Sequence, residues 1–113
     1  MESQLKYLNE VEQAVDEFKG ELPQAYAARD DFIDKIYQDG ILNTKTKRLM
    51  AMAVAIREGC PGCITYQTKK AVEAGATKAE VVEAAAVATS MGGTTASAWV
   101  WIVVQIMKEM GKW

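Results

Sequence analysis

Residues 55–66, which read AIREGCPGCITY, contain the turn around which the rest of the chain is organised. Gly59 follows a helical run and can adopt the left-handed backbone conformation that commonly ends a helix. Pro61 suits a first helical position, because its missing N–H would have no partner there. Cys60 then falls at the N-cap, and Cys63 falls in the first turn. The stretch therefore predicts that one helix ends here and that the next begins at a pair of cysteines.

Apolar residues before this turn recur at every third or fourth position, which is the spacing of one helix face. Leu5, Leu8 and Val11 begin the first such stripe. Residues 41–44 form a short loop that ends in an N-cap. Three helices are expected on this evidence: from Leu5 to Gly20, from Leu22-Pro23 to Asp39-Gly40, and from about Lys45 to Glu58.

The rest of the chain also predicts helices. The fourth is expected to end at Gly75, and Thr77-Lys78-Ala79-Glu80 matches the capping box that starts a fifth. Residues 84–88 are apolar on every side, which predicts close packing on most faces, and Gly92-Gly93 is expected to break this helix. Thr95 to Met110 has the aromatic and β-branched content of a strand, but no other segment offers a partner strand, so a last helix is expected. The expected fold class is all-α, with about six helices.

Composition limits the compartment and the classes of partner. With 113 residues, half of them hydrophobic, the chain is expected to form one domain over residues 1–113. A net charge of -2 without a basic run argues against nucleic acid. The longest strongly apolar run, residues 98–104, is far short of the ~20 residues that cross a membrane. The N-terminus has no secretion signal, so a cytoplasmic location is expected.

Cys60 and Cys63 are the only cysteines, and the chain has no histidine. In a reducing cytoplasm such a pair is better explained as redox-active than as a structural staple, because one thiol can attack an oxidised substrate and the other can close a disulfide. The helix N-terminus is expected to lower the pKa of Cys60 more than that of Cys63. Cys63 lies one turn further into the helix and is expected to be the more enclosed of the two. The alternative is that both are buried small hydrophobes.

No cofactor or metal is expected. A zinc site needs about four ligands, and two sulfurs without an imidazole could complete one only by sharing between subunits. Gly92-Gly93-Thr94 lacks the lysine of a phosphate-binding loop.

Several stretches in a fixed order resemble a known family. They are Leu42–Leu49, Ala51–Ile56, Gly59–Cys63, Ala71–Thr77 and Met91–Gly93, which cover roughly the middle half of the chain. This order is similar to the carboxymuconolactone decarboxylase superfamily, and specifically to its AhpD-like alkylhydroperoxidase branch. The resemblance implies an all-helical domain that assembles into homo-oligomers, trimers or hexamers, with the dithiol near a subunit interface.

The resemblance also implies roles for the two thiols. In peroxidase members the second cysteine of the motif, here Cys63, attacks the peroxide and becomes a sulfenic acid. The first, here Cys60, donates a proton and then closes the disulfide, which a dithiol reductant such as a lipoyl-bearing protein reopens. This order is the reverse of the one that the helix dipole favours, since the dipole nominates Cys60 as the more acidic thiol.

Two positions depart from the family pattern. Peroxidase members carry a glutamate twelve residues before the first cysteine and a histidine four residues after the second, where this chain has Arg48 and Gln67. Neither side chain can relay a proton at neutral pH. Arg48 could instead stabilise a thiolate, and Gln67, one turn beyond Cys63 on the same face, could hydrogen-bond to a thiolate or a peroxide.

The sequence therefore predicts a dithiol-disulfide oxidoreductase of the alkylhydroperoxidase type, an antioxidant enzyme with peroxiredoxin activity. It would reduce hydroperoxides or protein disulfides, with peroxidase activity weakened by the missing relay. One alternative is a carboxymuconolactone decarboxylase-type enzyme, although members with that activity depend on histidine. The other is a non-catalytic oligomeric module that senses redox state.

Overall fold

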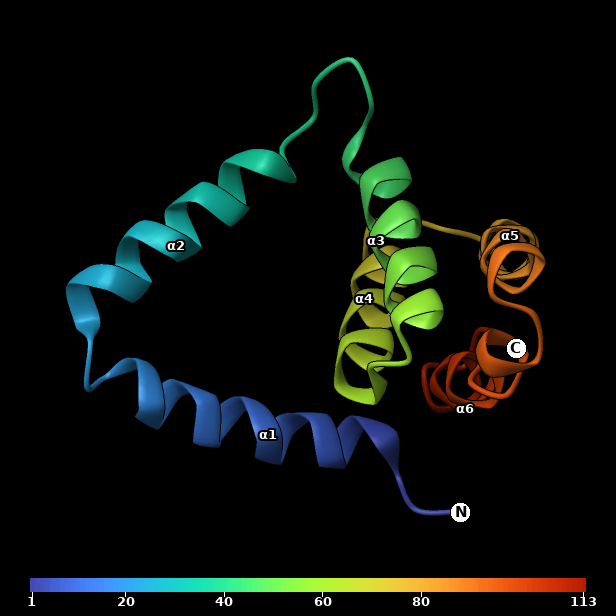
Figure 1. The fold of residues 1–113 in the computed structure, drawn as a ribbon, viewed down its shortest axis with the longest axis horizontal. Coiled ribbons are helices and arrows are strands. Elements are labelled where there is room, and N and C mark those ends of the chain that lie inside the picture. The colour runs from blue at the N-terminus through green and yellow to red at the C-terminus, as the bar shows by residue number, and fades with distance from the viewer.

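The computed structural model describes the whole chain, residues 1–113, and consists of six helices without any strand. They are α1 (Gln4–Lys19), α2 (Pro23–Ile36), α3 (Thr44–Glu58), α4 (Pro61–Glu73), α5 (Lys78–Ser97) and α6 (Val100–Glu109) (Figure 1). The all-α class that the sequence predicts is confirmed. The capping box at the start of α5 is also present, since Thr77 accepts from the Glu80 N–H and the Glu80 side chain accepts from the Thr77 N–H.

The core lies among α3, α4, α5 and α6. α3 packs along both α4 and α5, and α6 packs against α4 (Figure 1). Burial of apolar side chains between these helices is the main favourable contribution to folding, at roughly 25 cal/mol per Å² of apolar surface. The largest fully buried apolar side chains are Met52, Ile56, Ile64, Val81, Ile102, Ile106 and Met107.

α1 and α2 extend away from this core (Figure 1). α1 packs against α4 and α6 and buries Leu8. α2 buries none of its residues, and the side chains of Phe32 and Ile36 are 64% and 49% exposed. Phe32 and Ile36 therefore remain open to solvent within this chain, whereas Tyr26 of α2 packs edge-on against Phe18 of α1.

The joint between α2 and α3 ends α2 earlier than the sequence predicts, at Ile36. Lys47 Nζ donates to the carbonyls of Ile36 and Gln38, and Thr44 Oγ1 donates to the carbonyl of Tyr37. These side chains satisfy carbonyls that another helical turn would have used. The N-cap of α3 is Asn43, whose side chain accepts from the Thr46 N–H, so α3 begins at Thr44.

α5 is interrupted at Gly93, as the sequence predicts, because its φ of 59° and ψ of -142° are not helical and suit glycine. A short helical segment follows the break and ends at Ser97. α5 buries only one face, because α3 and α6 are its neighbours, and Val87 on the opposite side is 61% exposed. The predicted close packing on most faces is therefore wrong for this chain. No single helix is long and apolar enough to cross a membrane; α5 and α6 reach that length only together, and they are bent by 104°.

Candidate active site at the start of α4

The turn between α3 and α4 has the predicted conformation. Gly59 adopts a φ of 70°, and the N–H groups of Gly59 and Cys60 both donate to the carbonyl of Ala55. Cys60 is the N-cap of α4, and Pro61 is its first residue. A methyl group on Gly59 would lie 2.9 Å from Trp99 Nε1, so the indole ring closes over this turn from the α5–α6 corner.

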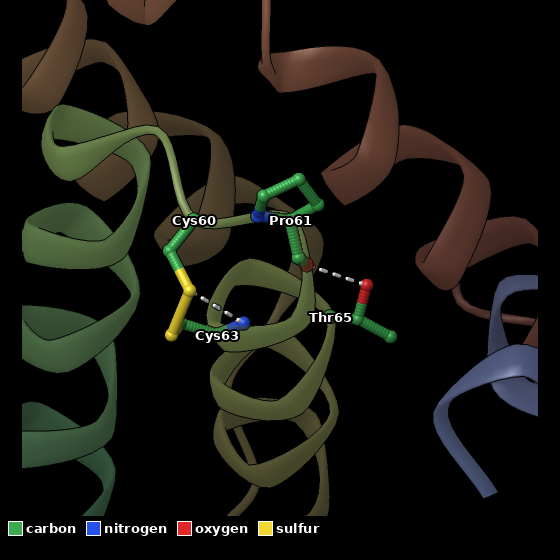
Figure 2. The surroundings of a disulfide bond; sticks show 4 residues. All are labelled: Cys60, Pro61, Cys63 and Thr65. Atoms are coloured by element: carbon green, nitrogen blue, oxygen red, sulfur yellow. Dashed lines mark hydrogen bonds between the residues drawn. A yellow bond between two sulfur atoms is a disulfide. The ribbon is translucent and has the colours of Figure 1, made fainter. Parts of the chain in front are cut away.

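Cys60 and Cys63 form a disulfide at the start of α4, with their Cα atoms 5.2 Å apart (Figure 2). The sulfur of Cys60 accepts a hydrogen bond from the Cys63 N–H at 3.3 Å. Thr65 Oγ1 donates to the carbonyl of Pro61 at 3.0 Å, which ties the first turn together (Figure 2). A thiolate on Cys60 would therefore face a free backbone N–H and the positive end of the helix dipole.

The two cysteines differ in exposure, in the opposite sense to the prediction. Cys63 is exposed, whereas Cys60 is only half-exposed. The prediction that Cys63 is the more enclosed is therefore wrong. The first turn of α4 thus leaves Cys63 open to solvent.

Arg48 on α3 and Gln67 on α4 contact each other. Arg48 Nη1 donates to Gln67 Oε1 at 3.0 Å. The guanidinium carbon also lies 3.6 Å from the ring centre of Tyr37 and 5.8 Å from that of Tyr66. The structure thus joins the two positions that depart from the family pattern, and it holds the arginine against aromatic rings.

Tyr37 is a residue of this site that the sequence did not identify. It is the C-cap of α2, and its ring reaches Arg48 only because the α2–α3 joint folds back. No motif marks it. Three further ionisable residues close to the cysteines in sequence are Glu58, which is exposed, and Tyr66 and Lys69, which are half-buried. Of these, Tyr66 contacts Arg48.

The site contains no evident metal position, because no group of three or more His, Cys, Asp or Glu side chains is close enough to hold an ion. One polar atom of α4 is unusual. Thr68 is fully buried, and its Oγ1 has no hydrogen-bond partner.

Comparison with known proteins relates this fold to solved and curated relatives. A carboxymuconolactone decarboxylase family protein of Legionella pneumophila, solved in its apo form, is 27% identical and superimposes with a TM-score of 0.90 over 98% of this chain and 100% of that chain. An uncharacterised protein of Cupriavidus necator is 34% identical over 71 residues, which are 63% of this chain, and the match spans only 63% of that protein's length. Uncharacterised protein 4 of the cox locus of Paracoccus denitrificans is 40% identical over 76 residues, 64% of this chain and 68% of that protein.

The family itself is shown by a longer match. Residues 23–105 match the carboxymuconolactone decarboxylase family, and they include α2 to α5, most of α6 and both cysteines. The paired cysteines at the start of α4 are consistent with the AhpD-like branch. Because the matched residues make up more than half of the sequence, the chain belongs to the carboxymuconolactone decarboxylase family.

Proposed function

We propose that this protein is a dithiol-disulfide oxidoreductase of the alkylhydroperoxidase type, which reduces hydroperoxides or protein disulfides through Cys60 and Cys63. One observation carries the proposal. The two cysteines form a disulfide at a helix N-terminus, with Cys63 exposed and Cys60 at the N-cap. Such a pair can cycle between dithiol and disulfide by thiol-disulfide exchange.

The greater exposure of Cys63 supports attack by that residue. A substrate that approaches from solvent meets Cys63 first. The Cys63 thiolate attacks one oxygen of the hydroperoxide, the O–O bond breaks, the alcohol leaves with a proton, and Cys63 becomes a sulfenic acid. The Cys60 thiolate then attacks the Cys63 sulfur, which forms the disulfide and releases the hydroxyl group as water.

The N-cap position of Cys60 supports its role in the return step. A dithiol reductant attacks the exposed Cys63 sulfur, and Cys60 leaves as a thiolate facing the Cys63 N–H. Thiols of lower pKa leave faster, so the helix N-terminus speeds this step. The second thiol of the reductant then resolves the mixed disulfide and restores both cysteines. A lipoyl-bearing protein is a reductant of the required class.

The presence of Arg48 and Gln67 supports the proposal that peroxidase activity is weak. Neither can carry a proton between the thiols and water, so the leaving alcohol must take its proton from the Cys60 thiol or directly from water. The positive charge of Arg48 favours a nearby thiolate, which preserves thiol-disulfide exchange even without a relay.

The exposed apolar side chains of α2 support assembly into a homo-oligomer, and sedimentation would test for three or six times the 12.4 kDa of one chain.

The test is peroxide consumption in the presence of a dithiol reductant, together with chemical trapping of the sulfenic acid. In Cys60→Ser, we expect dimedone to label Cys63 after exposure to one equivalent of hydroperoxide, and turnover to be lost. In Cys63→Ser, we expect neither labelling nor turnover. Full activity in the variant that lacks both cysteines would contradict the proposal. Oxidation of both thiols without turnover would instead favour a redox sensor.

A further inference from the structure

Arg48 is a cation without an acidic partner. The ion pairs of the structure join Lys19, Arg29, Lys35, Lys45 and Lys70 to carboxylates, and none includes Arg48. Its only hydrogen bond goes to Gln67, whose side chain is neutral. No carboxylate neutralises this half-buried guanidinium, so its charge is available to a ligand.

The free edge of this guanidinium reaches solvent. Arg48 has five N–H donors, and only Nη1 has an acceptor in the protein. Nε and Nη2 have no partner, yet the only buried side-chain polar atom without a partner is Thr68 Oγ1. Nε and Nη2 must therefore be accessible to solvent. A planar edge of this kind is the part of arginine that binds a carboxylate with two parallel hydrogen bonds.

The guanidinium is held before any ligand arrives. The ring centre of Tyr37 lies 3.6 Å from its central carbon, and Gln67 fixes one nitrogen. Tyr37 is itself fixed, because Thr44 Oγ1 donates to its carbonyl and Lys47 Nζ donates to the carbonyls on either side. Little side-chain freedom remains to be lost when an anion binds, which favours affinity.

Gln67 also fixes the place of this cation relative to the reacting sulfur. Residues four apart on a helix have Cβ atoms about 5–6 Å apart, so Gln67 stands beside Cys63 on the same face of α4. Arg48 is one hydrogen bond further on. A substrate sulfur at Cys63 thus places groups a few atoms away within reach of the free guanidinium edge.

We propose that Arg48 is a carboxylate-binding site, and that the dithiol prefers oxidised substrates that carry a carboxylate a few atoms from the bond to be reduced. This inference rests on the proposed function. With a disulfide RSSR, the Cys63 thiolate attacks one sulfur, forms a mixed disulfide and releases RS⁻. The Cys60 thiolate then attacks the Cys63 sulfur and releases the second RS⁻. Two cysteine thiols are oxidised as one RSSR becomes two thiols.

The test compares three disulfides on one short skeleton. These are dithiodiglycolate, which carries two carboxylates, bis(2-hydroxyethyl) disulfide, which is neutral, and cystamine, which carries two ammonium groups. The rate of the reduced protein with each is divided by the rate of dithiothreitol with the same disulfide, which removes intrinsic reactivity. We expect the normalised rate with dithiodiglycolate to exceed that with the neutral disulfide about tenfold or more, and cystamine to be slowest. Salt should reduce the difference.

Variants of Arg48 assign the preference. In Arg48→Gln, we expect the tenfold preference for dithiodiglycolate over the neutral disulfide to vanish, on top of any slowing that all three disulfides share because the thiolate has lost a nearby positive charge. Arg57→Gln is the matched control, because Arg57 is an exposed arginine of the same helix, and it should keep the preference. Equal rates in the wild type, an unchanged preference in Arg48→Gln, or an equal slowing of all three disulfides would each overturn the inference. The last result would show that Arg48 acts on the thiolate alone.

A binding measurement separates this inference from the proposed function. Thiodiglycolate has the same carboxylates on a thioether and cannot be reduced. In the variant with both cysteines replaced by serine, it should shift the Arg48 Nε–H signal in NMR spectra saturably, and this shift should be absent from Arg48→Gln. No shift would overturn the carboxylate site. A shift in this variant, when the wild-type protein reduces neither a hydroperoxide nor any of the three disulfides, would leave the site standing and refute the proposed function.

Discussion

Gln67 is the residue at which a single substitution would best separate thiol-disulfide exchange from peroxidase chemistry. It lies one turn beyond Cys63 on the face that carries the exposed sulfur, and it is bound to Arg48. Exchange with a disulfide needs only a thiolate and a leaving thiolate. Reduction of a hydroperoxide also needs a proton for the leaving alcohol, and an amide cannot supply one.

We expect Gln67→His to raise hydroperoxide turnover about tenfold or more, since a positioned general acid typically contributes a factor of 10²–10⁴. Disulfide reduction by the same variant should change little. Gln67→Asn is the control, because it alters size without adding an ionisable group. Turnover is measured as hydroperoxide consumption with excess dithiol, and an unchanged rate in Gln67→His would show that the missing relay does not limit the wild-type protein.

The contacts that fix the side chain of Arg48 could not be predicted from the sequence. The sequence placed Cys60 at an N-cap and Pro61 at a first helical position, because both depend on neighbours along the chain. The pairing of Arg48 with Gln67 and its stacking on Tyr37 join three helices. Such contacts depend on how helices pack, which local spacing does not determine.

At the scale of helices, the turn from α3 to α4 is fixed by two different constraints on Gly59. Its φ of 70° is a conformation that other L-residues adopt at a cost of roughly 1–2 kcal/mol. A Cβ there would also lie 2.9 Å from the indole nitrogen of Trp99, at the corner between α5 and α6. The α3–α4 turn, which carries the dithiol, therefore meets the α5–α6 corner at Gly59, a residue without a side chain.

We expect Gly59→Ala to destabilise the fold more than Gly75→Ala does. Gly75 has a φ of 95°, and no side chain or distant backbone atom lies within 4 Å of the position that its Cβ would occupy, so its substitution measures backbone strain alone. Gly59→Ala should add the cost of displacing Trp99, on the order of 1–3 kcal/mol for an overpacked site. Urea unfolding followed by circular dichroism gives both values. Equal losses would show that Trp99 moves aside freely and does not hold the turn.

Helix ends and helix breaks were predicted with unequal success for a physical reason. Gly59, the Thr77–Glu80 capping box and the break at Gly93 depend on residues close in sequence, and all three are confirmed. The end of α2 at Ile36 was not predicted, because Thr44 and Lys47 of the next helix hydrogen-bond to the carbonyls at and just beyond its end.

At the scale of the whole molecule, the two ends of the chain are joined by Glu109. Its carboxylate accepts hydrogen bonds from Ser3 Oγ and from the N–H groups of Gln4 and Leu5, which cap α1 from the end of α6. Gln105 Nε2 donates to the same carboxylate. Burial raises the pKa of Glu109, but these hydrogen bonds together outweigh it and lower the pKa to about 2.

The lowered pKa predicts how the attachment of α1 depends on pH. A carboxyl whose pKa is lower in the folded state than its usual value of about 4.3 stabilises the fold fully above that value. The contribution falls as the pH decreases and is lost by about pH 2, when the folded state also binds the proton.

We expect Glu109→Gln to destabilise the protein at pH 7 by roughly 1.5–3 kcal/mol, the usual contribution of hydrogen bonds to a charged group. Because the variant has no carboxylate to protonate, its unfolding free energy should approach that of the wild type between about pH 5 and about pH 2.5. Urea unfolding across this range measures the gap, and Glu2→Gln, at an exposed residue beside the same helix end, is the control. A gap that stays constant with pH would mean that the carboxylate's charge is not what holds α1 to α6.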